Sequence, residues 1–499
     1  MNKLPQTLSE RLSENAQLLK KLLPSEDILS YAFQTEDNID CILFYADGMV
    51  NKELLGTLVA RPLSATELKN AQTKEREVLV NTRFPELKTV EKPQDMLKEI
   101  LDGNALLLVD GFTTGFIVGA KLLPVRAIIE PPTDIAVKGP REGFIEDIKT
   151  NMTLIRKRLK TPDLRFETLR VGKRSDTAVA ICYLEGTSNK KLKDELVAKI
   201  KKISVDVIPD SSYISAFLSP HPHSFFRSVG TTEKPDIFTA KIAEGRVGIL
   251  VDGSPIAITA PYTLTEDFQS SEDYFISPFM ATIFRALRFI SLFVAIMLPA
   301  FYVSAQLFKA QLVPLGLALT IASSVRELPL SPALEMFVVL FLLETLKEAS
   351  IRMPKYVGMS LSVVGALVLG ETAVSAGFLS TPAIIIVAFS GICLYTVPNF
   401  VETGSILRWL FLLVAGGLGP FGIVLLSTLL LVYLVTLEAF DTPILAPFAP
   451  LTPHDLRDAV VKYDMQSLTT RPKIFASPNK TRLKRSAKKD IQNKGETAK

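Results

Sequence analysis

The stretch FISLFVAIMLPAFYVSAQLF, residues 289–308, decides the fold, because it contains 20 consecutive uncharged residues. As a helix, a segment of this length crosses about 30 Å of hydrocarbon. Long uncharged stretches recur as far as Thr436, whereas charges are frequent and mixed before Phe284. The whole chain has 499 residues, of which 48% are hydrophobic, and a mean hydropathy of +0.27. We therefore predict an α/β soluble N-terminal region followed by an all-α polytopic membrane domain.

The polar and apolar blocks on either side of this stretch predict six parts. A short helix with a polar tether opens the chain, two α/β subdomains follow, and an amphipathic elbow leads into the membrane. A polar, basic tail ends the chain. The expected limits are 1–30 for the helix and tether, 31–135 and 136–264 for the subdomains, 265–288 for the elbow, 289–440 for the transmembrane domain, and 441–499 for the tail.

Short apolar runs that end in Asp-Gly turns, alternating with helical patterns, predict the α/β subdomains. In the first we expect strands at 41–45, 105–109, 116–118 and 125–129 and a helix at 93–102. In the second we expect helices at 144–159 and 189–203 and strands at 166–171, 177–184 and 246–253.

Four to six crossings are expected in the membrane domain, and an even number is favoured. Residues 312–322 are apolar but too short to cross alone, and residues 357–378 and 383–397 predict further spans. Residues 409–436 are interrupted by the sequence GGLGPFG. They form either one long tilted span or a tight hairpin.

Ionisable residues within apolar segments are costly in a bilayer, so they usually face protein or water. Three glutamates stand in such segments, namely Glu335, Glu344 and Glu371. Glu335 and Glu344 have a structural alternative to a functional role, in which they lie near an interface and pair with Lys347 or Arg326. Glu371 lies among small and polar residues, which favour either close helix packing or a polar stripe along an aqueous pore. The candidate pore-lining residues are Ser360, Ser362, Gly365, Glu371, Thr372 and Ser375.

The placing of basic residues predicts the orientation. Arg285 and Arg288 precede the first span, where we expect them to reach lipid headgroups at the membrane interface. Eight lysines and arginines lie between Lys480 and Lys499. Because basic segments stay on the cytoplasmic side, and because residues 1–30 have no apolar secretory signal, we expect both ends to be cytoplasmic.

Several classes of protein are disfavoured. Nucleophile elbow, phosphate loop, dinucleotide fingerprint and zinc-protease motifs are all missing, so we expect no catalytic residue and no cofactor. Cys41, Cys182 and Cys393 are far apart, and His221 and His223 are spaced poorly for a metal, so we expect no metal site. The net charge of +4 favours no nucleic-acid partner.

One long motif carries a resemblance. The sequence RAIIEPPTDIAVKGPREGFIED, residues 126–147, continues to Asn151 and Arg156 and resembles the central motif of the GerA spore-germination family. The blocks GRVGILVDGSP at 245–255 and RALRF at 285–289 resemble the same family. The motif residues we single out, for structure or coupling, are Arg126, Glu130, Pro131, Gly139, Pro140, Arg141, Glu142, Asn151 and Arg156.

The resemblance implies a membrane subunit of a germinant receptor in the spore inner membrane. Family A subunits act with a transporter-like B subunit and a lipoprotein C subunit. They self-associate, as pentamers, into a nutrient-gated channel for monovalent cations. The family also includes SpoVAF-type accessory proteins, and the sequence does not separate the two kinds.

Two other functions compete with the channel. In one, the chain is a non-conducting signalling scaffold that relays the ligand state of a partner. In the other, it is a secondary transporter, for which the broken spans near Pro329 and Gly416 are suggestive but an inverted repeat is missing.

Overall fold

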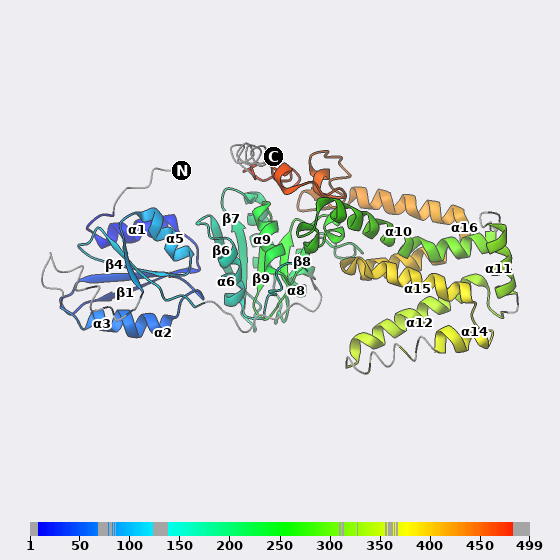
Figure 1. The fold of residues 1–499 in the computed structure, drawn as a ribbon, viewed down its shortest axis with the longest axis horizontal. Helices are drawn as coiled ribbons and strands as arrows, with labels where there is room; N and C mark the ends of the chain where they lie inside the picture. The colour runs from blue at the N-terminus through cyan, green and yellow to red at the C-terminus, as the bar shows by residue number, and fades with distance from the viewer. Residues whose placement is uncertain are drawn as a thin grey trace, which may run out of the picture.

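The computed structural model describes residues 8–67, 78, 82, 84, 86–122, 138–308, 311, 314–326, 328–354, 357, 363, 365 and 368–482. Two α/β units follow one another along the molecule, and a helical region occupies the other end (Figure 1). The segment after the last helix returns to the second α/β unit, where the hydroxyl of Ser477 donates to the carbonyl of Thr187 at 2.7 Å. The predicted fold class is confirmed.

The first unit is a five-stranded antiparallel sheet with helices on both faces. Its strands are β1 (Ile28–Gln34), β2 (Asp40–Ala46), β3 (Leu87–Val90), β4 (Ala105–Val109) and β5 (Gly115–Val118), in the order β1-β2-β4-β5-β3. Alternate residues of β4 point to opposite faces. Leu106 and Leu108 pack under α1 (Leu12–Leu22) and α5 (Pro93–Leu101), whereas Leu107 packs against the short helical turns between Lys52 and Ser64.

The second unit repeats this plan. Its strands are β6 (Leu164–Val171), β7 (Thr177–Leu184), β8 (Gly230–Thr232), β9 (Val247–Val251) and β10 (Ala257–Ala260), in the order β6-β7-β9-β10-β8. Helices α6 (Ile148–Arg158) and α9 (Pro235–Ala243) cover one face. Helices α7 (Lys190–Lys201) and α8 (Ser211–Leu218) cover the other.

The two units are structural repeats down to individual hydrogen bonds. Asp110 accepts from the backbone N–H of Leu12 at the start of α1, as Asp252 does from Ile148 at the start of α6. Asn15 bonds both backbone groups of the residue six positions before it, and Asn151 does the same. The sequence shows the relation too, because EKPQDMLKEILDGNALLLVDG (91–111) aligns without gaps with EKPDIFTAKIAEGRVGILVDG (233–253).

The structure differs from our expectation for the first 30 residues. Helix α1 is part of the first unit, because Leu12 and Leu19 are buried against Phe44 of the sheet. The segment after it is the edge strand β1, where we expected a tether. The strand expected at 125–129 lies outside the described residues. The other expected strands and helices of both units are present, within a few residues of their expected limits.

The helical region contains α10 (Pro278–Phe308), α11 (Leu315–Val325), α12 (Pro332–Arg352), the π-helical turn η5 (Val368–Thr372), α14 (Ala373–Ser375), α15 (Thr381–Tyr395) and α16 (Val401–Thr436). Among the described residues, Pro278–Phe308 and Pro398–Thr436 are long and apolar enough to cross a membrane, and Thr381–Tyr395 is a shorter apolar helix. Part of the expected elbow is the first turns of α10 itself, because this helix already begins at Pro278.

Helix α16 is a hairpin, which decides between our two alternatives for residues 409–436. Phe400 and Tyr433 both contact the ring of Phe226, with centroids 6.0 and 6.2 Å away. A straight helix would separate these two residues by roughly 50 Å. The chain reverses at Gly419, which has φ +62° and lies so close to Phe308 that a Cβ atom there would be 2.6 Å from that ring. Only glycine suits this backbone and this contact.

Candidate functional site

The segment around Glu371 lies on the outside of the helical region. Glu371, Thr372 and Ser375 are all exposed, and they stand on η5 and the short helix α14. A π-helical turn widens the helix locally and is frequent at functional sites. Gly365 is buried instead, and a Cβ atom there would contact Leu346 at 3.1 Å. The structure therefore brings three of our pore candidates to one exposed edge, while Ser360 and Ser362 lie outside the described residues.

Glu344 is the centre of a charge cluster between three helices. It forms ion pairs with Lys347, 2.7 Å away on the same helix α12, and with Arg408 of α16. Ser405 of α16 donates a further bond at 3.0 Å. The expected pairing with Lys347 is confirmed. Arg408 is nearly fully buried and also donates to Ser390 of α15 at 3.1 Å, so this cluster ties α12, α15 and α16 together.

Ser390 connects this cluster to α10. Pro299 has no N–H, so the carbonyl of Ala295 lacks its helical partner. The hydroxyl of Ser390 donates to that carbonyl at 2.7 Å. The kink-prone point of α10 is thus held from α15, next to Arg408.

Glu335, at the start of α12, is completely buried. One carboxylate oxygen accepts from the backbone N–H of Ser380, just before α15. Among the described residues, the other oxygen has no hydrogen-bond partner, and this glutamate forms no ion pair. The alternative that Glu335 pairs with Arg326 or Lys347 is therefore not what the structure shows.

We expected Arg285 and Arg288 to reach lipid headgroups, but the structure does not place both of them there. Their guanidinium groups share the buried carboxylate of Asp273, at 2.8 and 2.9 Å. Arg285 is completely buried and also pairs with Asp458 of the C-terminal segment at 2.9 Å. A buried guanidinium requires charged partners. Here Asp273 precedes the membrane half in the sequence, and Asp458 follows it. The arginines therefore fasten α10 to the soluble half and to the tail.

The family-motif residues lie at the boundary between the two α/β units. Arg156 of α6 is buried and forms a bidentate pair with Asp27, at 2.8 and 2.7 Å, in the segment that leads to β1. Asn151 holds the loop before α6, as described above. Glu142 pairs with Lys157 at 3.0 Å and with Arg158 at 2.6 Å. These bonds hold the loop that leads into α6, and they hold the first unit against the second.

Three more motif residues precede α6. Gly139 has φ +119°, and a Cβ atom there would lie 2.6 Å from the ring of Phe275, near the start of α10. Pro140 and Arg141 continue this loop. The loop thus contacts the entry to the membrane half. Arg126, Glu130 and Pro131 lie outside the described residues.

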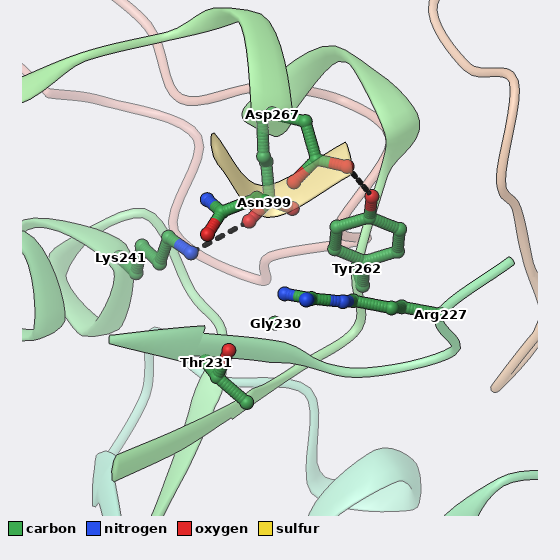
Figure 2. Close-up of a pocket in the computed structure, with 8 residues that line it drawn as sticks. Arg227, Gly230, Thr231, Lys241, Tyr262, Asp267 and Asn399 are labelled. Atoms are coloured by element: carbon green, nitrogen blue, oxygen red, sulfur yellow. Dashed lines mark hydrogen bonds and ion pairs between the residues drawn. The ribbon is translucent and has the colours of Figure 1, made fainter. Parts of the chain in front are cut away.

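A cavity of about 470 Å³ lies where the second unit meets the helical region. Its walls come from α9, from the turns between Leu264 and Tyr274, from α10, and from the loop between α15 and α16. Figure 2 shows a smaller pocket that shares lining residues with this cavity, and into which Lys241 and Arg227 point. Lys241 forms an ion pair with Glu266 at 2.7 Å.

The pKa values of the two acidic groups in this cavity are shifted in opposite directions. Burial raises the pKa of Asp267 to about 6, although the hydrogen bond from Tyr262 opposes it. Burial also favours the neutral form of Glu266, but Arg246 and Lys241 outweigh it and hold the pKa of that carboxyl below its usual value. The junction therefore contains charges of both signs, mostly paired with one another.

The geometry defines a membrane protein with a duplicated α/β region fastened by buried ion pairs to a helical bundle. The family model "Bacillus/Clostridium GerA spore germination protein" matches residues 16–474. The chain therefore belongs to the GerA family, and it is a spore germination protein homologous to the A subunits of germinant receptors.

Individual relatives agree. The chain is 33% identical to "Uncharacterized membrane protein YfkQ" of Bacillus subtilis, over 97% of this chain and 96% of the relative. It is 31% identical to "Spore germination protein KA" of the same organism, over 96% and 89%. The crystal structure of the N-terminal domain of the A subunit of the Bacillus megaterium spore germinant receptor GerK3 is 26% identical, covers 51% of this chain and 96% of its own, and has a TM-score of 0.41.

Our sequence reasoning missed Arg408, Asp273 and Asp458. Arg408 had a usable signal, because it stands between Leu407 and Trp409 in an otherwise apolar segment. The two aspartates had none, because their partners are distant in sequence or stand beside many other charges.

Proposed function

We propose that this chain is a germinant receptor A subunit that assembles with copies of itself, as a pentamer, into a nutrient-gated channel for monovalent cations. It works with a transporter-like B subunit and a lipoprotein C subunit in the spore inner membrane. The observation that carries this proposal is the exposed edge formed by Glu371, Thr372 and Ser375 in the membrane half of a GerA chain.

An exposed carboxylate in the segment 357–378, which we expect to span the membrane, needs an explanation. Placing a charged side chain at the centre of a bilayer costs about 2.5–3.5 kcal/mol on insertion scales. Water in a pore between copies removes this cost, and a ring of carboxylates attracts cations. The neighbouring hydroxyls of Thr372 and Ser375 suit the same wet surface.

The path of the chain supports a common side for the soluble units and the tail. Arg285, before the first long helix, contacts Asp458, after the last one. The α16 hairpin likewise returns Tyr433 to the level of Phe400. With the tail basic, this side is the cytoplasmic or spore-core side.

The scaffold function remains the second candidate, and one observation favours it. The ion pairs of Arg285 and Arg288 connect α10 to the end of the soluble half. A signal relay needs this connection as much as a gated pore does. A SpoVAF-type accessory protein would use the same connection.

Substituted cysteines test the pore face. The three native cysteines are buried, so a charged thiol reagent should spare them. We expect Glu371→Cys, Thr372→Cys and Ser375→Cys to react in reconstituted receptor and the reaction to change cation flux. Glu348→Cys, on the exposed part of α12, is the control that reacts without changing flux. Flux that is insensitive at all three positions would favour the scaffold.

A further inference from the structure

A second polar site lies inside the helical region, away from the exposed Glu371 edge. Glu335 is 0% exposed, and its oxygen Oε2 has no hydrogen-bond partner among the described residues. The hydroxyl of Tyr302 and both amide atoms of Gln306 are also buried, and the part of the chain that the structure describes offers them no well-aligned hydrogen-bond partner. These four atoms come from α10 and α12. They are side-chain atoms that water does not reach.

The unpartnered groups face one another. Tyr302 and Gln306 are four positions apart on α10, so they share one face of that helix. The hydroxyl of Tyr302 lies close to the side chains of Gln306 and Ser380, in contacts that do not have hydrogen-bond geometry, and it lies near the charge of Glu335. Ser380 in turn donates its backbone N–H to Glu335, which places the carboxylate at the start of α15. Side chains of α10 and α12 therefore meet the residue that precedes α15.

Among the described residues, no positively charged side chain pairs with this cluster. A buried carboxylate without a cation is expensive, and the N-terminus of α15 supplies only about half a charge. Glu335 forms no ion pair with any described residue, in contrast to Glu344 with its two cations. The side chains of Glu335, Gln306 and Tyr302 each carry an oxygen atom that could bind a cation and so supply the missing positive charge.

The chemistry of these donors selects the ligand. Carboxylate, amide and hydroxyl oxygens suit hard cations rather than soft metals. A single carboxylate balances a single positive charge, and in the described part of the chain no three His, Cys, Asp or Glu side chains gather as a metal site. We propose that Glu335, Gln306 and Tyr302 bind one monovalent metal cation, such as Na⁺ or K⁺, inside each subunit.

The proposal goes beyond channel function and does not depend on it. A cation at this point would hold the second half of α10, the start of α12 and the start of α15 together. It would do so in each subunit, whether or not the assembly conducts.

Binding of ²²Na⁺ and ⁸⁶Rb⁺ to the purified full chain tests the site. The measurement uses a scintillation proximity assay without nutrient and without partner subunits, so its outcome is separate from that of the pore. We expect saturable binding that unlabelled NaCl or KCl displaces and choline chloride does not. Glu335→Gln should weaken it by at least about tenfold, the scale seen when metal-site groups are lost.

Two milder variants guard against misfolding of Glu335→Gln. Gln306→Met and Tyr302→Phe keep the carboxylate and the packing volume, and each should weaken binding several-fold. Glu348→Gln, which removes an exposed glutamate of the same helix, should bind like the wild type.

Three outcomes would overturn the proposal. They are the absence of saturable binding to the wild type, unchanged binding by Glu335→Gln, and a melting temperature that depends on Glu335 and pH but not on the cation. The last would mean that the site takes a proton.

Discussion

The soluble and helical halves of this chain differ in the side chains that they expose. In the α/β units the apolar residues point inward, as in both faces of the first sheet. In the helical half large apolar side chains point outward, with Leu315 75% and Phe421 71% exposed, while Glu335 and Arg408 are buried. A surface of this kind is unfavourable in water and suits lipid. The two halves are therefore folded for different solvents.

Their buried charges differ as well. In the soluble half, Arg156 and Asp27 form a closed pair of opposite charges. In the helical half, Glu344 faces two cations and Glu335 faces none among the described residues. Between the halves, Asp273 holds two arginines at once. The pairs in and next to the soluble half are complete, so removing one partner there should have large and calculable effects.

The largest effect is expected at the boundary. Asp273→Ala leaves Arg285 and Arg288 without their shared carboxylate, and Arg285 is fully buried. We expect a loss of about 4–5 kcal/mol, the upper part of the range for a broken buried pair. Calorimetric melting of the full chain in detergent measures it. Arg174→Ala, which breaks the exposed pair with Asp206, should change the melting temperature little. Equal effects of the two variants would contradict the importance of the junction.

The next effect concerns the seam between the α/β units. Arg156→Met leaves Asp27 buried and unpaired, and should destabilise the chain by about 3–4 kcal/mol. Arg156→Met with Asp27→Leu removes both charges and should recover most of that loss. Melting of the single and double variants gives the coupling energy directly. Purely additive losses would show that the pair is not the link between the units.

A smaller effect depends on pH. The pKa of Asp267 is raised to about 6 from 3.8, mainly by burial. The native state therefore binds more protons than the unfolded state between these values, so stability falls as pH rises from about 4 to 6, by about 2–3 kcal/mol. Asp267→Asn keeps an acceptor for Tyr262 and should remove this slope. Melting temperatures at pH 4 to 7 compare the two proteins, and parallel curves would contradict the assignment.

Much of the soluble fold was predictable because its inner strands are short and wholly apolar. The strands at 105–109 and 177–184 could be predicted from this apolar composition. Strand β1 did not, because its side chains are mostly exposed or half-buried and only pairing with β2 makes it a strand. The sequence reasoning did not identify the duplication. The two EKP…LVDG segments show it once the matching bonds of Asn15 and Asn151 are known.

The candidate site was less predictable. An intramembrane glutamate can be recognised from sequence, but its partner depends on how the helices pack. Glu344 pairs with Lys347 nearby in sequence, as expected, and also with Arg408, which is 64 positions away. The burial of Arg285 likewise depends on a tail segment that lies beyond all the membrane helices. Such distant pairs have no local signal.

The most direct test of the proposed function is membrane depolarisation in growing cells that express this chain with its B and C partners. The proposed function predicts depolarisation that depends on nutrient and is altered by Glu371→Gln, while Glu348→Gln behaves like the wild type. Assembled, membrane-inserted receptor that never depolarises the cell, or that does so identically with Glu371→Gln and Glu371→Ala, would contradict a pore at this edge.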